Sequence, residues 1–353
     1  MKKLFKLFVA AIVVLFSASS AAQIAVALHG EEQVTFYYTS SGFSDAVAAA
    51  SEGDTIYIPG GIFPVNNLEI NKKLHVFGVG HSPNVNSSTG RTQINGNIII
   101  TTGADFGSIS GLFVNGNVSI GSTNANQTVS NITIHRCHIN GTLKLTHDGD
   151  PAKMGSNITL TQNIIGALNG QMIRNSLIRQ NVIGRLFYFS DNNLFVNNII
   201  QRTSEYFSWG YSGINGSTFR NNIFVSVMYT NLETGGYNNC KFHCNVFVAD
   251  VTLGSSNSSD TNPNLVNQQL ESVFVGYDGA VAFLYDYNFR LNDAFAGKNF
   301  GTDGTDVGIY GTITPFKADY LPVIPYIKSH SISSDSNVNG KIEITIEVEA
   351  QQH

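Results

Sequence analysis

A seven-residue pattern of polar and apolar positions recurs six times in the middle of the chain. The copies occupy residues 131–137, 157–163, 175–181, 192–198, 216–222 and 239–245, at spacings of 26, 18, 17, 24 and 23 residues. The fourth position is apolar in every copy, from Ile134 to Phe242, whereas the fifth is polar in five of the six. This alternation has the period of a strand with one buried face. A mostly apolar pair follows each copy, such as Ile164 and Ile165, which predicts a second short strand beyond a bend.

The last position of the copy is Asn in five cases and Cys137 in the first. Asn tolerates left-handed backbone better than any residue except Gly, so we expect this position to form the bend. If the units stack, their Asn side chains can also hydrogen-bond along the stack. The pattern therefore predicts an Asn ladder between two rows of strands.

A unit of about 20 residues with two or three short strands cannot bury its apolar side alone, so neighbouring units must stack. Successive coils in one direction pair equivalent strands in parallel, and the preferred crossover makes the coil right-handed. The sequence thus predicts an all-β, single-stranded right-handed parallel β-helix over residues 23–320. The span from 34 to 300 has room for eleven or twelve coils.

Both ends of this β-helix have candidate caps, because open strand edges need cover. Residues 44–50 are the only helix-like stretch after residue 22 and precede the first coil. Residues 341–349 alternate strictly and follow Asn339 and Gly340, a strong hairpin signal. We expect a C-terminal β-hairpin or cap within residues 321–353.

Composition supports this architecture. Charged residues make up 13% of the chain, about half the usual share, while Asn reaches 38 residues, 36 of them between Asn66 and Asn299. Coiled coils need many charged helix formers, and disordered chains need low hydrophobicity, whereas 42% of this chain is hydrophobic. Both classes are excluded.

Residues 1–22 have the features of a secretory signal peptide. Lys2, Lys3 and Lys6 precede an apolar run that ends before a small-residue cleavage site. The sequence therefore predicts export to the periplasm, the cell surface or the medium, with no membrane span. Loss of three lysines leaves 17 basic against 25 acidic residues, so nucleic acid is an improbable partner and polyanionic glycans are mildly disfavoured. The oligomeric state is open.

Three segments carry a family resemblance. Residues 53–61 and 74–80 resemble the opening coils of the pectin-lyase-like superfamily of right-handed β-helix proteins, and the Asn-centred copies resemble its inner coils. Residues 301–311 resemble the closing stretch of secreted β-helix proteins from Bacteroidetes-type bacteria. The resemblance implies a carbohydrate-related architecture and leaves activity open.

The catalytic motifs of that superfamily's enzymes are missing. Polygalacturonase-like hydrolases carry Asn-Thr-Asp, Asp-Asp, Gly-His-Gly and Arg-Ile-Lys strings, none of which occurs here; His81 follows Gly-Val-Gly instead. The central coils also have few carboxylates from which to build an acid and a base. Lys144 and Glu205 are the one ionisable pair nominated as catalytic candidates. Whether the chain is an enzyme is left open.

Metal sites have weak support in the sequence. Asp148 and Asp150 could ligate calcium, although two carboxylates fall short of six oxygen ligands, so we expect no cofactor, with calcium as the alternative. Asp303 and Asp306 favour a structural turn. A zinc site at residues 240–244 is disfavoured because alternation separates the side chains.

Other polar residues are too far apart to form a site. His135 and His243 share one column but lie five coils apart, and Arg179 and Arg220, two coils apart, favour solvated surface charge. The three cysteines, residues 137, 240 and 244, lie too far apart for any disulfide, which predicts three buried free thiols.

A third strand should lie between successive copies, in 141–146, 185–190, 205–209, 226–230 and 250–253. In the resembling families this sheet lines the saccharide groove. Its aromatic residues suit stacking on sugar rings, and the carbohydrate-binding candidates are Tyr188, Tyr206, Trp209 and Tyr229. The first hypothesis is a protein that binds a polysaccharide along this sheet without the known catalytic set. The alternatives are a polysaccharide lyase or glycoside hydrolase with an unrecognised site, and a structural protein of the cell surface.

Overall fold

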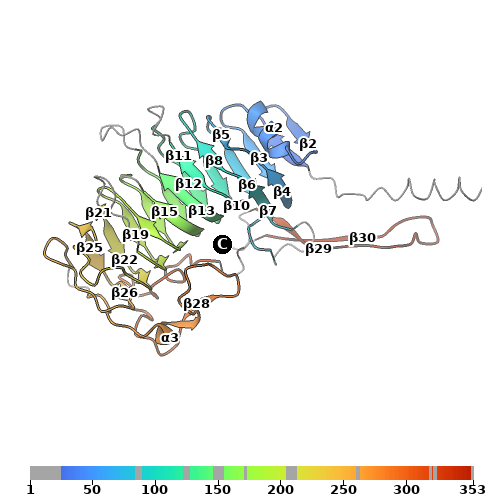
Figure 1. Cartoon of the computed structure of the whole chain (residues 1–353). Coiled ribbons are helices and arrows are strands. Elements are labelled where there is room, and N and C mark those ends of the chain that lie inside the picture. Colours follow the sequence, from blue (N-terminus) through green and yellow to red (C-terminus); the bar gives the residue numbers. More distant parts are fainter. Residues whose placement is uncertain are drawn as a thin grey trace, which may run out of the picture.

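The computed structural model describes residues 25–83, 90–121, 128–145, 155–170, 173–203, 213–259, 263–317, 320 and 324–350. Stacked coils form a rod, with a short helix at its N-terminal end and a long hairpin after its last segment (Figure 1). Every strand pair within the coils is parallel, so the predicted parallel β-helix is confirmed.

The first sheet contains the first strand of each copy. Its strands, in spatial order, are β2 (Val34–Tyr37), β1 (Val26–His29), β3 (Thr55–Ile58), β6 (His75–Gly78), β9 (Ser108–Ser110), β12 (Thr133–His135), β14 (Thr159–Thr161), β16 (Leu177–Arg179), β19 (Leu194–Val196), β22 (Thr218–Arg220) and β25 (Lys241–His243). Equivalent positions pair without a register shift from β12 to β25, and the fourth column is fully buried, as the alternation predicts. The fifth column faces outward except for His243, which is buried. Next to it, Thr302 donates to Asn221 from outside the rod, so this end of the column is covered.

The second sheet contains the strands beyond the bend. They are β26 (Val246–Phe247), β23 (Ile223–Phe224), β20 (Ile199–Ile200), β17 (Val182–Ile183), β15 (Ile164–Asn169), β13 (His138–Leu145), β10 (Phe113–Asn115), β7 (Thr92–Asn95) and β4 (Gly61–Pro64), with β5 (Leu68–Ile70), β8 (Ile98–Ile100), β11 (Val118–Ile120) and β18 (Leu186–Phe187) beside them. The predicted third strand is the second half of β13 and β15 and continues in β18. Residues 226–230 form no strand, and 250–253 contribute one isolated bridge, which corrects the expectation of a regular third strand there. Just before the first-sheet strands β22 and β25, the short strand β21 (Ile214–Asn215) pairs in parallel with β24 (Tyr237–Asn238).

The Asn ladder is confirmed, and it continues one coil further than predicted. Asn163, Asn181, Asn198, Asn222 and Asn245 each donate from Nδ2 to the Oδ1 of the next, ending at Asn264, with distances of 2.9 to 3.0 Å. The position of the bend needs a correction. The left-handed residue is the one before the ladder Asn, for example Gln180 at φ 55° and Asn197 at φ 54°. The ladder Asn itself is buried, so its role is to bond the backbone of neighbouring coils.

The coils end earlier than predicted. Nine coils carry strands of the first sheet from β3 to β25, and residues 258 and 265 add single bridges of a partial tenth, instead of the eleven or twelve expected. Residues 264–317, here called the return segment, then run back along the outside of the second sheet. They contain α3 (Leu270–Val273), β27 (Phe274–Gly276) and β28 (Asn288–Leu291), so residues 44–50 are not the only helix-like stretch after residue 22.

The return segment covers an apolar row on the outer side of the second sheet. Ile164, Val182, Ile199, Ile223 and Val246 form this row and pack in one buried cluster with the return segment. The chain therefore has two cores, one inside the coils and one outside them. Asp303 and Asp306 accept hydrogen bonds within the return segment, which agrees with the predicted turn role.

The predicted N-terminal helix, terminal hairpin and free thiols are also present, but the hairpin strands pair only with each other among the described strands and do not cap the last coil. Helix α2 (Gly42–Ala49) packs against the first strands, and β29 (Tyr326–Ile332) pairs with β30 (Ile344–Glu349) as the terminal hairpin. All three cysteines are buried and unpaired, and burial raises the pKa of the Cys137 thiol to about 12. Among the described residues, no helix is long and apolar enough to cross a membrane. The predicted signal peptide lies outside the described residues.

Candidate functional site

A stack of glycines forms a corner of the second sheet. Gly116, Gly141, Gly166 and Gly184 come from four successive coils, where the chain turns from the second strand to the third. A Cβ on Gly141 would lie 2.4 Å from the Gly116 carbonyl oxygen, and one on Gly184 would lie 2.4 Å from that of Gly166. Larger residues would collide with the neighbouring backbone, so this corner has no side chains.

An open groove of about 470 Å³ lies along this corner, between the third strand and the return segment. Its lining includes His138, Asn140, Thr142, Arg185, Gln201 and Phe283, together with two of the stacked glycines and aliphatic residues. Asn140 and Arg185 are exposed and free to contact a ligand. Gln201 is buried and donates to the Tyr277 hydroxyl at 2.8 Å, which fixes the return segment to the rod. Among the described residues, no carboxylate lines the groove.

One wall of the groove is held by a buried cluster of His81, His138 and Tyr285. The His138 and His81 Nδ1 atoms lie 2.7 and 3.1 Å from the Tyr285 hydroxyl oxygen, which donates to the His81 carbonyl at 2.8 Å. Because the hydroxyl proton is used in that bond, both Nδ1 atoms donate to the phenolic oxygen, so each ring carries a proton on Nδ1. This cluster joins the return segment to two parts of the rod that are distant in sequence but adjacent in space.

Burial controls the charge of this cluster. Desolvation lowers the pKa of His138 to about 3, with a further contribution from Arg91, whose guanidinium lies 3.6 Å from the centre of the Phe113 ring. Desolvation likewise lowers the pKa of His81 well below its usual range, and the neighbouring His138 and Arg91 lower it further. Both imidazoles are therefore neutral at pH 7. They are suited to hold the groove wall rather than to exchange protons near neutrality.

The sequence candidates lie partly beside this groove. Lys144 faces outward on β13, two residues beyond Thr142, and does not line the groove. Tyr188 and Tyr229 are half-buried and also lie outside the lining; Tyr188 has φ 36° and its ring centre is 6.2 Å from that of Phe187. Glu205, Tyr206, Trp209, Asp148 and Asp150 lie outside the described residues. Among the described candidates, Lys144, Tyr188 and Tyr229 do not line the groove, although Thr142 and Arg185 of the predicted third strand do.

Sequence reasoning missed the histidine and tyrosine cluster. A signal was present, because His138 is the one polar residue in a column that is otherwise Ile164, Val182, Ile199, Ile223 and Val246. Arg179 and Arg220 do lie two coils apart on the first sheet, and Arg179 donates to the Thr314 hydroxyl at 2.6 Å. Arg220 is exposed, in agreement with solvated surface charge.

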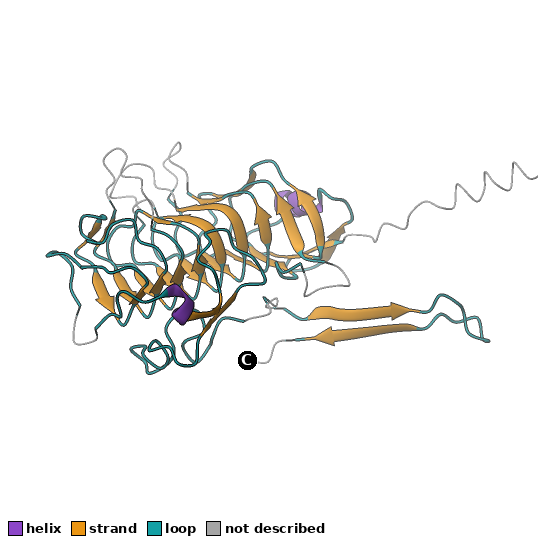
Figure 2. Cartoon of the chain, turned by 60° about the horizontal axis from the view of Figure 1, so that its bottom comes forward, coloured by secondary structure: helices purple, strands orange, loops and turns teal. Residues whose placement is uncertain are grey.

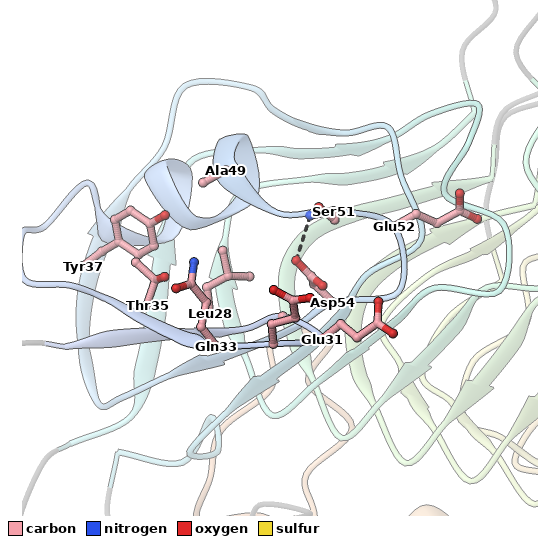
Figure 3. Close-up of a pocket in the computed structure, with 11 residues that line it drawn as sticks. Leu28, Glu31, Gln33, Thr35, Tyr37, Ala49, Ser51, Glu52 and Asp54 are labelled. Carbon is pink, nitrogen blue, oxygen red and sulfur yellow. Dashed lines mark hydrogen bonds between the residues drawn. The ribbon is translucent and has the colours of Figure 1, made fainter.

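A second groove lies at the N-terminal end of the rod. Glu31, Glu32, Glu52 and Asp54 line it (Figure 3). Asp54 accepts a hydrogen bond from the Ser51 backbone at 2.7 Å, so this carboxylate stabilises the turn after α2. Within the described part of the chain, no three His, Cys, Asp or Glu side chains are grouped closely enough to hold a metal ion. This acidic groove is therefore not assigned a ligand.

Comparison with known proteins yields no family model and no curated protein that matches the chain. Among solved structures, pectate lyase Pel9A is 13% identical, with 76% of this chain and 90% of that chain covered, at a TM-score of 0.36. The PL6 family alginate lyase AlyGC is 14% identical, with 62% and 39% covered, at a TM-score of 0.27. Likenesses this distant say nothing about activity. The resemblance to pectin-lyase-like β-helix proteins is confirmed for the architecture, by the strand order and the Asn ladder of this chain.

Proposed function

We propose that this chain is an exported β-helix protein that binds a polysaccharide in the groove along the glycine corner. The observation that carries the proposal is the lining of that groove. It offers an amide, a hydroxyl, a guanidinium and an aromatic wall on an open surface, and its described lining residues include no carboxylate. These are the groups that hydrogen-bond and stack on sugars.

The shape of the groove supports an extended ligand. Successive coils are ~4.8 Å apart, so the same groove position repeats along the rod. Because the corner has no side chains, a ligand chain can approach the backbone between Asn140 and Arg185. Arg185 supplies a planar donor suited to hydroxyl or carboxylate oxygens, and this local cation favours glycans that contain acidic sugars, despite the overall negative charge.

Binding is favoured over hydrolysis by the same lining. A glycoside hydrolase of the usual kind needs two carboxyl groups on opposite sides of the bond, and the part of the lining that the structure describes supplies none. A polysaccharide lyase needs a base for the proton beside the uronate; the exposed Arg185 and the neighbouring Lys144 are the candidates for that alternative.

The experiment measures glycan binding by the mature chain and by a matched pair of variants. We expect neutral and acidic plant or host glycans on an array to include at least one ligand, and Arg185→Ala to weaken its binding about tenfold, the loss of one charge-assisted contact. Arg220→Ala removes an equally exposed arginine from the first sheet and should leave binding unchanged. Folded protein that binds no glycan above background, or equal losses in both variants, would reject the proposal.

The same incubations test the enzyme alternative. The bound glycan is followed over time for unsaturated products and for new reducing ends. A stable glycan supports binding alone. New unsaturated ends that disappear in Arg185→Ala or Lys144→Ala would instead assign a lyase to this groove.

A further inference from the structure

The terminal hairpin lacks the neighbours that normally stabilise two strands. Strands β29 and β30 pair with each other and with no other described strand, and the hairpin projects from the rod (Figure 2). An isolated two-stranded hairpin is marginally stable in water, because a third strand or an apolar surface is needed to cover it. The hairpin alone therefore lacks the second layer that would cover it.

The two faces of the hairpin differ sharply. Cross-strand pairs on one face are Ile327 with Val348, His330 with Ile346, and Ile332 with Ile344. Ile332, Ile344, Ile346 and Val348 are 59%, 60%, 56% and 61% exposed. The opposite face is polar and internally bonded: Lys328 lies 3.2 Å from Glu349 and 3.5 Å from Glu347. One face thus needs a cover and the other does not.

We propose that this apolar face is the contact through which two copies of the chain associate. A two-fold axis passes through the central pair, His330 and Ile346. The Ile327 and Val348 pair of one hairpin then lies on the Ile332 and Ile344 pair of the other. The carboxylates of Glu347 and Glu349 then point away from the contact into water, so like charges are kept apart. Two amphipathic hairpins packed in this way form a four-stranded, two-layer unit.

The size of the face sets the strength of the association. Seven residues at ~3.4 Å by two strands at ~4.8 Å give about 230 Å² per face and about 460 Å² in total, well below the about 1,200 Å² of a standard specific interface. We therefore expect a weak, concentration-dependent dimer. A lipid surface is the less suitable partner, because Asp335, Glu343, Glu347 and Glu349 outnumber Lys328 and Lys341 on the hairpin and anionic headgroups would repel it.

Sedimentation velocity of the mature full chain over a wide concentration range tests the proposal. The wild type should pass from monomer to dimer as concentration rises, and Ile346→Lys should remain monomeric. Thr345→Lys places the same charge on the polar face and should leave the dimer intact. A wild type that stays monomeric throughout, or dimers that survive Ile346→Lys, would overturn the proposal.

A crosslinking variant tests the contact without a substitution that could unfold the hairpin. His330→Cys lies at the proposed axis and should form a disulfide-linked dimer on mild oxidation, whereas Ser331→Cys on the opposite face should not. The native cysteines are buried and do not compete. Equal crosslinking by both variants would contradict the proposed face, and capture of the monomer by phosphatidylcholine vesicles would reassign it to lipid.

Discussion

The two cores of this molecule are built in different ways. Inside the coils, like residues stack on like: the Phe195, Phe219 and Phe242 rings are nearly parallel, with centres 4.5 and 5.0 Å apart. In the outer core, rings within the non-repeating return segment meet one another at steep angles, such as 82° between Phe274 and Tyr277. Each coil thus adds one layer to the inner core, whereas the outer core is a single layer between the second sheet and the return segment.

This difference predicts different consequences when each core is damaged. An inner column is shared by consecutive coils, so a defect in one coil weakens pairing in both neighbours. The return segment can open locally while the rod keeps its parallel sheets. The inner core should therefore control global stability, and the outer core should control the groove wall.

Phe219→Ala is expected to have the largest effect. The side chain is 0% exposed between two stacked rings, and such truncations cost about 3–5 kcal/mol. Denaturant unfolding followed by far-UV circular dichroism measures the loss. The matched variant Phe289→Ala removes an equally buried ring from the outer core. Hydrogen exchange should then rise throughout the rod for Phe219→Ala and only in residues 264–317 for Phe289→Ala; exchange that spreads equally in both would remove the distinction between the cores.

Asn198→Ala tests the ladder that borders the inner core. The Asn198 side chain accepts from the Asn181 backbone and amide and donates to the Ile178 carbonyl and to Asn222, at 2.8 to 3.0 Å. Truncation leaves buried donors and acceptors without partners, at about 1–3 kcal/mol each, and we expect a total of about 2–4 kcal/mol. Asn115→Ala removes an exposed partner of Asn140 and should cost little. Equal losses in the same denaturation assay would show that burial of the ladder is unimportant.

The inner core was readable from the sequence and the outer core was not, for a physical reason. Stacking forces equivalent residues into the same environment, so Ile134 through Phe242 reveal their burial by repetition. The ladder was found in the same way, although the bend was placed one residue late because Gln180 and Asn197 share a left-handed conformation without sharing a residue type. Repetition in the sequence therefore reveals the features that the coils share.

The candidate site depends on what the coils do not share. Tyr285 reaches His81 across 204 residues of sequence, and nothing in either local pattern predicts the pair. The sequence predicts the apolar row on the outer side of the second sheet only as part of a second strand. It does not tell whether an apolar residue that points outward contacts solvent or packs under another segment. The resembling families suggest a ligand face on the third strand, whereas the groove also depends on the path of the return segment, from which Val281, Ala282 and Phe283 line it.

The acid sensitivity of the outer core sharpens the comparison most directly. Because burial lowers the pKa of His138 to about 3 and lowers that of His81, both bind a proton when unfolded near pH 6.5 but not when folded. This contribution to stability is fully present above that pH and is lost as the pH falls. For His138 the loss runs toward about pH 3, at no more than about 1.4 kcal/mol per pH unit, and His81 acts in the same direction. Burial also lowers the pKa of His135, on the rod, to about 4. Protonation of His135 therefore adds its own loss of stability, which is independent of the return segment. His81→Gln with His138→Gln keeps side chains that can donate to Tyr285 and should flatten the stability profile between pH 6.5 and 5, leaving the part due to His135. An unchanged profile in the double variant would mean that the outer core is not opened by these protons.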